Sequence, residues 1–193
     1  AKKEGFNPKT VLIGPITYLL LGKEKEEGFD RIDLIQNLLP VYFEIIHDLI
    51  NHGANTIQFD EPFLALDLDE KSKTAYQEVY KKIRKEFPQL TIQVATYFDG
   101  LKDNTALAIN LPIDILHLDL VRDENQIDEI LNQIPSQLKL SLGLVDGRNI
   151  WKNDFQKSLS TIEKVVNKIG EKRVIISTSC SLLHSPCDLD LET

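Results

Sequence analysis

The stretch Ile113-Asp114-Ile115-Leu116-His117-Leu118-Asp119-Leu120 is short, mostly apolar, and carries a His and an Asp near its end. A run of this kind is typical of a strand that is covered on both faces, as in a parallel sheet. Similar runs occur on both sides of it, at Thr10–Ile13, Thr56–Asp60, Leu90–Thr96, Leu138–Leu144 and Arg173–Thr178. The sequence therefore predicts six strands.

Amphipathic stretches with the length of helices separate these runs. The first begins at Asp30, a capping residue, and stops at Gly53, and Pro40 inside it predicts a kink or a break into two pieces. The others cover Lys71–Phe87, Asp103–Asn110, Glu124–Gln133 and Asp154–Ile169. Repeated alternation of strand and helix produces right-handed crossovers and a parallel sheet.

Polar clusters follow nearly every predicted strand. They are Gly14-Pro15, Asp60-Glu61-Pro62, Thr96-Tyr97-Phe98-Asp99, His117-Leu118-Asp119, Asp146-Gly147-Arg148-Asn149 and Ser179-Cys180-Ser181. Sites built from many strand ends are typical of a (βα)8 barrel, whereas an open doubly wound sheet binds its ligand at one switch point. We expect an α/β fold: a (βα)8 TIM-type barrel, incomplete, with about six of its eight units in residues 1–193 and no internal domain boundary.

The composition excludes several classes of protein. The net charge is −8 and the lysines form no stripe, which argues against binding to the backbone of nucleic acid. No apolar run is long enough to cross a membrane, and no signal segment opens the chain. With only Cys180 and Cys187 available, we expect a cytoplasmic protein. Because Met is absent altogether, we expect a piece of a longer polypeptide.

Three pairs of residues could carry chemistry. Asp60 and Glu61 could bind an amine or a metal ion, or act as general acid and base, although neighbours in a strand point to opposite faces and one could merely orient the next loop. His117 and Asp119 project from the same face of their strand, where they could pair with each other or contact a ligand. A hydrogen-bonded His–Asp pair is the more common outcome. Cys180 with His184 lacks the further ligands of a zinc site and a base positioned for a nucleophile.

Several phrases together resemble one family, the cobalamin-independent methionine synthases, in its N-terminal half. They are Val11-Leu12-Ile13-Gly14-Pro15-Ile16-Thr17, Leu38-Leu39-Pro40-Val41-Tyr42, Gln58-Phe59-Asp60-Glu61-Pro62, Thr96-Tyr97-Phe98-Asp99, Gly147-Arg148-Asn149-Ile150-Trp151 and Ser179-Cys180-Ser181-Leu182-Leu183-His184-Ser185-Pro186. The similarity covers essentially the whole chain in consistent order.

The resemblance implies a folate-dependent homocysteine S-methyltransferase of methionine biosynthesis, made of two barrels. Its partners would be a C-terminal catalytic barrel of the same polypeptide, which holds zinc, and the substrates 5-methyltetrahydrofolate polyglutamate and homocysteine. The N-terminal barrel would support the architecture and the folate cleft. We therefore expect no turnover by this chain alone.

If the two halves are duplicates, the resemblance also implies where the zinc ligands should be sought. The His-x-Cys of the catalytic half would correspond to Tyr97-Phe98-Asp99, its Glu to Asp119 and its last Cys to Cys180, while Asp60 would match the aspartate that holds the homocysteine amine. A phenol, two carboxylates and one thiolate suit zinc poorly. We expect these five residues to be a vestigial site, with no catalytic residue, metal or cofactor in this chain.

Two alternatives remain open. The chain could be a non-catalytic scaffold or a folate-polyglutamate binding module. It could also be an independent barrel enzyme that uses the strand-end carboxylates Asp60, Glu61, Asp99 and Asp119.

The resemblance also implies that two strands of the N-terminal barrel, which would precede Thr10–Ile13, are missing from this chain. An open barrel exposes unpaired strand edges, so the piece is expected to self-associate.

Overall fold

The sheet has the strand order of a barrel wall. A computed structural model describes residues 4–6, 8–183 and 185, and here six parallel strands pair in the order β1-β2-β3-β4-β5-β6. Their bounds are β1 Thr10–Ile13, β2 Thr56–Asp60, β3 Thr91–Ala95, β4 Ile115–Asp119, β5 Lys139–Val145 and β6 Val174–Thr178. A doubly wound sheet would reverse its strand order, and this one does not. The prediction of an incomplete α/β barrel is confirmed.

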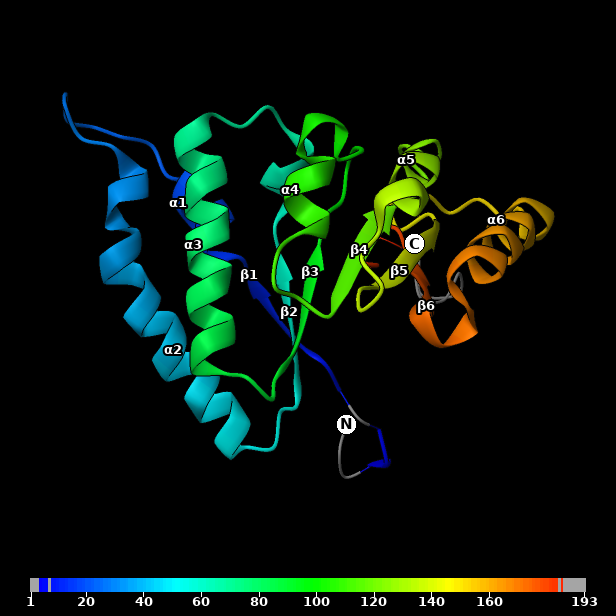
Figure 1. Ribbon diagram of the computed structural model, residues 1–193, viewed down its shortest axis with the longest axis horizontal. Coiled ribbons are helices and arrows are strands. Elements are labelled where there is room, and N and C mark those ends of the chain that lie inside the picture. Colours follow the sequence, from blue (N-terminus) through cyan, green and yellow to red (C-terminus); the bar gives the residue numbers. More distant parts are fainter. Residues whose placement is uncertain (1–3, 7, 184, 186–193) are drawn as a thin grey trace, which may run out of the picture.

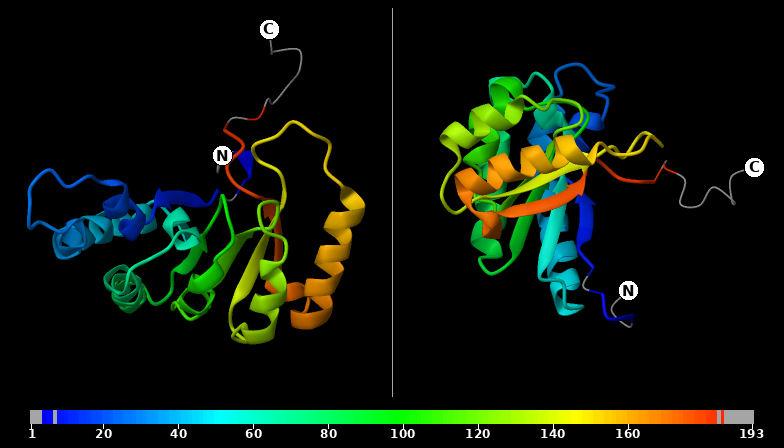
Figure 2. Two further views of the ribbon diagram at one scale, coloured as in Figure 1. Left: turned by 90° about the horizontal axis from the view of Figure 1, so that it is seen from above. Right: turned by 90° about the vertical axis from the view of Figure 1, so that its right-hand side faces the viewer.

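The helices follow the outer side of the curved sheet (Figures 1 and 2). They are α1 Pro15–Leu21, α2 Ile35–Asn51, α3 Glu70–Glu86, α4 Thr105–Ile109, α5 Gln126–Gln133 and α6 Phe155–Ile169, with 3-10 turns η2 Arg31–Leu34, η3 Pro62–Ala65, η4 Lys102–Asn104 and η5 Glu171–Arg173. No helix of this described part is long and apolar enough to cross a membrane.

Capping side chains fix where the helical segments begin. Asp69 accepts a hydrogen bond from the Ser72 amide at the start of α3, and Asp154 accepts one from the Lys157 amide at the start of α6. Such a side chain satisfies a backbone donor that has no partner within the helix. At the other end of α6, Gly170 has φ of 85°, a conformation that is easiest for glycine.

Two expectations about helices need correction. α2 runs unbroken through Pro40, and the change of geometry comes earlier, where η2 meets Ile35. Leu39 and Tyr42 lie buried on either side of Pro40, so the packing of this face holds the helix together. The sequence did not predict α1, because this helix has only seven residues and begins with Pro15. Proline is typical of turns, but it is also well suited to the first position of a helix.

The core lies between the sheet and the helices. Side chains of alternate strand positions point outward and are fully buried there: Ile57, Phe59, Ile92, Val94, Leu116, Leu118, Leu140 and Leu142. The expectation that the strands are covered on both faces is correct for β4, which is buried throughout. It is wrong for β1 and β6, whose positions are only half buried or exposed, because each has a neighbour on one side only in the described sheet.

The inner face of the sheet is unusually polar. It carries Gln58 and Asp60 on β2, Gln93 on β3, His117 on β4 and Ser141 on β5. Barrel interiors are usually filled by branched apolar side chains. This concave polar face, rather than the outer core, is the place where a site could form.

Candidate functional site

A pocket of about 330 Å³ opens on the inner face, near the carboxyl ends of the strands. This is the end at which barrel enzymes place their active sites. The pocket brings together three of the five predicted site residues, Asp60, Tyr97 and Cys180. Its other lining residues are Val11, Gln58, Ala95, His117, Ser177, Thr178 and Ser181.

Asp60 ends a row of hydrogen bonds that runs from Lys9, the residue before β1, through a side chain of β3 to β2. Lys9 Nζ donates to Gln93 Oε1 at 2.9 Å, and Gln93 Nε2 donates to Gln58 Oε1 at 3.0 Å. Gln58 Nε2 then donates to Asp60 Oδ1 at 2.7 Å, while the Tyr97 hydroxyl donates to Asp60 Oδ2 at 3.1 Å. Both carboxylate oxygens of Asp60 therefore already accept a hydrogen bond from within the protein.

Sequence reasoning did not single out Lys9, Gln58 or Gln93. A signal was present, because Gln58 alternates with the apolar residues Ile57 and Phe59 along its strand. In the sheet, Gln58 and Gln93 are register partners on neighbouring strands. That pairing depends on the register between two strands, which cannot be deduced from the alternation of residues within one strand.

Tyr97 and Cys180 are both held in their neutral forms. Burial raises the pKa of Tyr97, and the negative charge of Asp60 raises it further. Burial also raises the pKa of the Cys180 thiol. Gly147 lies against this cysteine, and a Cβ at that position would come within 2.9 Å of the Cys180 sulfur. The thiol is positioned by close packing and is not activated as a thiolate.

His117 is buried at the base of the pocket and is fully hydrogen bonded. Its Nε2 lies 3.1 Å from the Ser179 carbonyl oxygen, which can only accept, so Nε2 carries the hydrogen. Its Nδ1 then accepts from the Ser141 hydroxyl at 3.0 Å. Burial lowers the pKa of His117, so the ring stays neutral. The predicted His117–Asp119 pair does not form, since each residue has its own partners.

Asp119 organises the loops beside the pocket. Its Oδ2 accepts from the Phe98 amide at 3.0 Å, and its Oδ1 accepts from the amides of Val121 and Arg122 at 3.1 and 3.0 Å. Phe98 has φ of 81°, a costly conformation for a bulky residue. The bond to Asp119 holds the Phe98 amide in this conformation, and Arg148 lies 5.1 Å above its ring.

Asp99 and Glu61 lie away from the pocket lining. Asp99 is half-buried, accepts from the Gly100 amide and pairs with Lys102 at 2.5 Å. Glu61 is fully buried behind the sheet, against α1 and α3. Asp60 and Glu61 thus face opposite ways, as expected. The Glu61 carboxylate accepts its hydrogen bonds from α1 and α3, not from the loop that follows β2.

The arrangement does not support chemistry that needs two carboxylates. Of Asp60, Glu61, Asp99 and Asp119, only Asp60 lines the pocket. A general acid and a base, or an acid and a nucleophile, must face one reacting bond from fixed positions. The geometry therefore disfavours the reading as an independent barrel enzyme.

The donor set also does not fit a zinc ion. Among the described residues, no three of the His, Cys, Asp and Glu side chains come together in a way that could hold a metal. In the pocket itself, His117 uses both ring nitrogens, and the Cys180 pKa is raised rather than lowered. Zinc requires deprotonated thiolates and free imidazole nitrogens. His184 and Cys187 lie outside the described residues.

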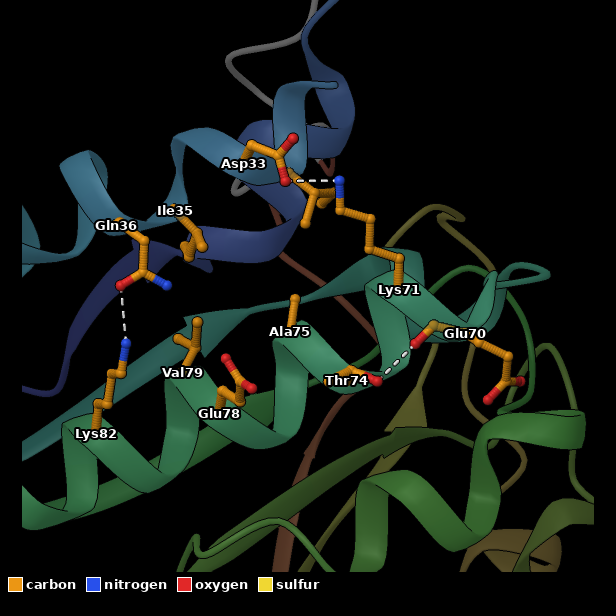
Figure 3. Close-up of a pocket in the computed structure, with 11 residues that line it drawn as sticks. Asp33, Ile35, Gln36, Glu70, Lys71, Thr74, Ala75, Glu78, Val79 and Lys82 are labelled. Carbon is orange, nitrogen blue, oxygen red and sulfur yellow. Dashed lines mark hydrogen bonds and ion pairs between the residues drawn. The ribbon is translucent and has the colours of Figure 1, made fainter. Parts of the chain in front are cut away.

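A larger groove, of about 450 Å³, lies on the outer side between η2, α2 and α3. Two lysines on α3 bond across it, as Figure 3 shows: Lys71 pairs with Asp33, at 2.6 Å, and Lys82 donates to the Gln36 side chain, at 2.9 Å. It shares no lining residue with the pocket of the inner face. The pocket of the inner face remains the candidate site.

Known proteins are similar to this chain along its whole length. The family described as "Cobalamin-independent synthase, N-terminal domain" matches residues 1–170. A 5-methyltetrahydropteroyltriglutamate–homocysteine methyltransferase of Flavobacterium johnsoniae is 56% identical over 195 residues, covering 100% of this chain and 25% of that protein. The protein of the same name from Cytophaga hutchinsonii is 53% identical over 190 residues, covering 97% of this chain and 24% of its own length. The chain thus spans about a quarter of these relatives.

Solved structures share the fold. A putative vitamin-B12 independent methionine synthase from Listeria monocytogenes superimposes with a TM-score of 0.67 at 17% identity, over 91% of this chain and 57% of that one. A B12-independent methionine synthase from Shewanella sp. W3-18-1, in complex with selenomethionine, gives 0.61 at 19% identity, over 90% and 55%. At such low identity the likeness concerns the fold alone.

Proposed function

We propose, from the premise that this chain belongs to the cobalamin-independent synthase family and matches its N-terminal domain, that it is part of a methyltransferase of methionine biosynthesis. That enzyme would move a methyl group from 5-methyltetrahydropteroyltriglutamate to homocysteine. The observation that carries this proposal is the 56% identity over the full chain to a relative named for that reaction.

We further propose that residues 1–193 are one domain with a supporting role in that enzyme. Asp60, Tyr97, Asp99, Asp119 and Cys180 would be the remains of a site, because their polar groups bond within the protein and do not converge on one point. The C-terminal barrel of the same polypeptide would supply the zinc and the catalytic residues. A cytoplasmic location belongs to the same proposal.

Methyl transfer tests this division of labour. Methionine formation from homocysteine and 5-methyltetrahydropteroyltriglutamate is measured with the 193-residue chain and with the full-length protein of the same reading frame. We expect turnover by the full-length protein and none by the chain. Turnover by the chain alone would show that it holds a complete site. No turnover by a folded, zinc-loaded full-length protein would refute the proposed reaction.

Whether this chain binds folate by itself separates the supporting role from a binding module. Calorimetric titration of the chain with the triglutamate substrate is expected to give no measurable heat of binding. A saturable heat with a one-to-one ratio would instead favour the folate-polyglutamate binding module.

The open edges of the sheet lead to a separate prediction. β1 and β6 each pair on one side only in the described sheet, and Val11 on β1 and Ile176 on β6 are 50% and 61% exposed. Unpaired strand edges favour association between copies. Size-exclusion chromatography with light scattering is expected to show dimers or larger species that shift towards monomer in Ile176→Lys. Leu66→Lys, at an exposed site away from both edges, is the control. A compact wild-type monomer would contradict this expectation.

A further inference from the structure

Glu61 is a fully buried carboxylate that joins three segments of the chain. It directly follows β2 and is 0% exposed. Its Oε2 accepts hydrogen bonds from the Thr17 amide at 2.8 Å and the Tyr76 hydroxyl at 3.0 Å, and its Oε1 accepts one from the Tyr80 hydroxyl at 3.0 Å. Thr17 lies in the first turn of α1, and both tyrosines lie on α3. The end of β2 is therefore tied to two helices through one side chain.

The chain leaves room for this carboxylate only because residue 14 is glycine. A Cβ at Gly14 would come within 2.0 Å of the Glu61 carboxyl carbon. The Gly14 amide also donates to the Asp60 carbonyl at 2.7 Å. The junction of β1 and α1 thus contacts the end of β2 at two adjacent points, the Asp60 backbone and the Glu61 side chain.

The surroundings of Glu61 favour the neutral form of its carboxyl more than an exposed position would. Burial raises the pKa of Glu61 to about 7, although the hydrogen bonds from Thr17, Tyr80 and Tyr76 act in the opposite direction. The pKa values of Tyr76 and Tyr80 are raised well above their ordinary value, mainly by burial, so both phenols remain protonated.

In the part of the chain that the structure describes, the titratable groups coupled to Glu61 provide no positive charge. Glu61 raises the pKa values of Tyr42 on α2 and of Tyr97 after β3, and Tyr18 on α1 acts on Tyr42. Asp60 adjoins it on β2. All of these are phenols or carboxyls. The buried charge of Glu61 is therefore balanced by hydrogen bonds and by the amino end of α1, not by an ion pair.

Thr17 supplies a spare partner for the protonated state. Its Oγ1 is buried and has no hydrogen-bond partner within the described residues, yet the hydroxyl influences the pKa values of both Glu61 and Tyr76. A protonated Glu61 must donate where it previously only accepted. One phenol can accept that hydrogen and turn its own towards Thr17 Oγ1. The cluster can thus satisfy its hydrogen bonds in both protonation states.

We propose that Glu61, Tyr76, Tyr80 and Thr17 form a proton-sensitive latch that sets how tightly the first turn of α1 is held against the end of β2. With Glu61 ionised, the Thr17 amide makes a charge-assisted bond and the latch is tight. Proton uptake removes the charge and weakens this bond. The change reaches the inner pocket, because Asp60 both bonds to the Gly14 amide and lines that pocket. This inference goes beyond the proposed function and does not depend on it.

Nuclear magnetic resonance of the chain labelled with carbon-13 at glutamate carboxyls and nitrogen-15 at amides tests the latch. We expect one carboxyl to titrate near pH 7 and the Thr17 amide shift to follow the same midpoint. In Glu61→Gln both transitions should disappear, whereas Glu78→Gln, on the exposed face of α3, should retain them. A Thr17 amide that does not follow the carboxyl would overturn the proposal, as would a Glu61 that titrates like an exposed glutamate.

Tyr80→Phe provides a second test that keeps the carboxylate. It removes one donor that lowers the Glu61 pKa, so the shared midpoint of Glu61 and the Thr17 amide should move to higher pH. Tyr18→Phe, which alters an exposed phenol of α1, should leave the midpoint in place. An unchanged midpoint in Tyr80→Phe would count against the latch even if Glu61→Gln failed to fold.

Discussion

Raising the pH from about 4.5 to about 7.5 is expected to lower the free energy of unfolding of the wild-type chain by about 3 kcal/mol more than that of Glu61→Gln. The pKa of Glu61 is raised from 4.5 to about 7 in the folded state, chiefly by burial. Between these two values the folded chain binds more protons than the unfolded chain, so stability falls as the pH rises. The contribution is complete below about 4.5 and is lost as the pH passes about 7.

Urea unfolding at a series of pH values measures this difference. Other acids change the stability in the opposite direction, because the pKa values of Asp30, Asp69 and Asp146 are lowered in the folded chain. Their effects cancel when the two proteins are compared at each pH. Glu78→Gln is the matched control and should run parallel to the wild type. Parallel curves for Glu61→Gln would instead mean that Glu61 titrates alike in the folded and unfolded chains.

Replacing Arg84 by alanine is expected to lower the free energy of unfolding by about 3 kcal/mol. Arg84 Nε donates to the Pro112 carbonyl at 3.1 Å, Nη1 to the Leu90 carbonyl at 2.8 Å, and Nη2 to Asp114 Oδ2 at 2.6 Å. One guanidinium therefore connects the end of α3 to the segments that lead into β3 and β4. Nη1 also reaches the Pro88 carbonyl at 3.4 Å, so the removal of Arg84 leaves four acceptors without this donor. Of these, the Asp114 carboxylate still accepts from the Ile92 amide.

An exposed ion pair provides the control for Arg84. The side chains of Lys102 and Asp99 are 58% and 43% exposed, against 25% and 42% for Arg84 and Asp114. Exposed pairs contribute little, so Lys102→Ala should cost under about 1 kcal/mol. Arg84→Lys should recover only part of the loss, since an ammonium group lacks the planar fork that reaches several acceptors. Equal effects of Arg84→Ala and Lys102→Ala would show that the backbone contacts of Arg84 add nothing.

The strands were predictable from sequence because each is a short apolar run between turn residues. Thr10–Ile13 and Thr56–Asp60 match the structure at both ends. Of the other four strands, three differ at both ends and one at its first residue, by one or two residues each time. Helix boundaries followed from local chemistry in the same way, as at Asp154 and Gly170 around α6. The exceptions are elements whose stability comes from tertiary packing: α1, which is short and rests on Glu61, and α2, which continues through Pro40.

The candidate site was predictable in its position but not in its contacts. Strand-end residues such as Asp60, Tyr97 and Cys180 do meet in one pocket. Spacing along one strand, however, placed His117 and Asp119 on a common face without revealing that Ser141 and the Ser179 carbonyl occupy the ring nitrogens. Those partners come from other strands, and their identity depends on register and on loop geometry. For the same reason sequence alone did not identify Glu61 as the centre of a buried cluster.

The row of hydrogen bonds on the inner face restricts which substitutions this sheet can accept. From Lys9 to Asp60 every bond runs in one direction, each amide using its nitrogen toward one neighbour and its oxygen toward the other. Replacing Gln93 by an aliphatic residue would leave both Lys9 and Gln58 without a hydrogen-bond partner in the row. A tolerated replacement must therefore change several residues of the row together. Across related sequences the four positions should therefore be inherited as a set, with mixed combinations rare.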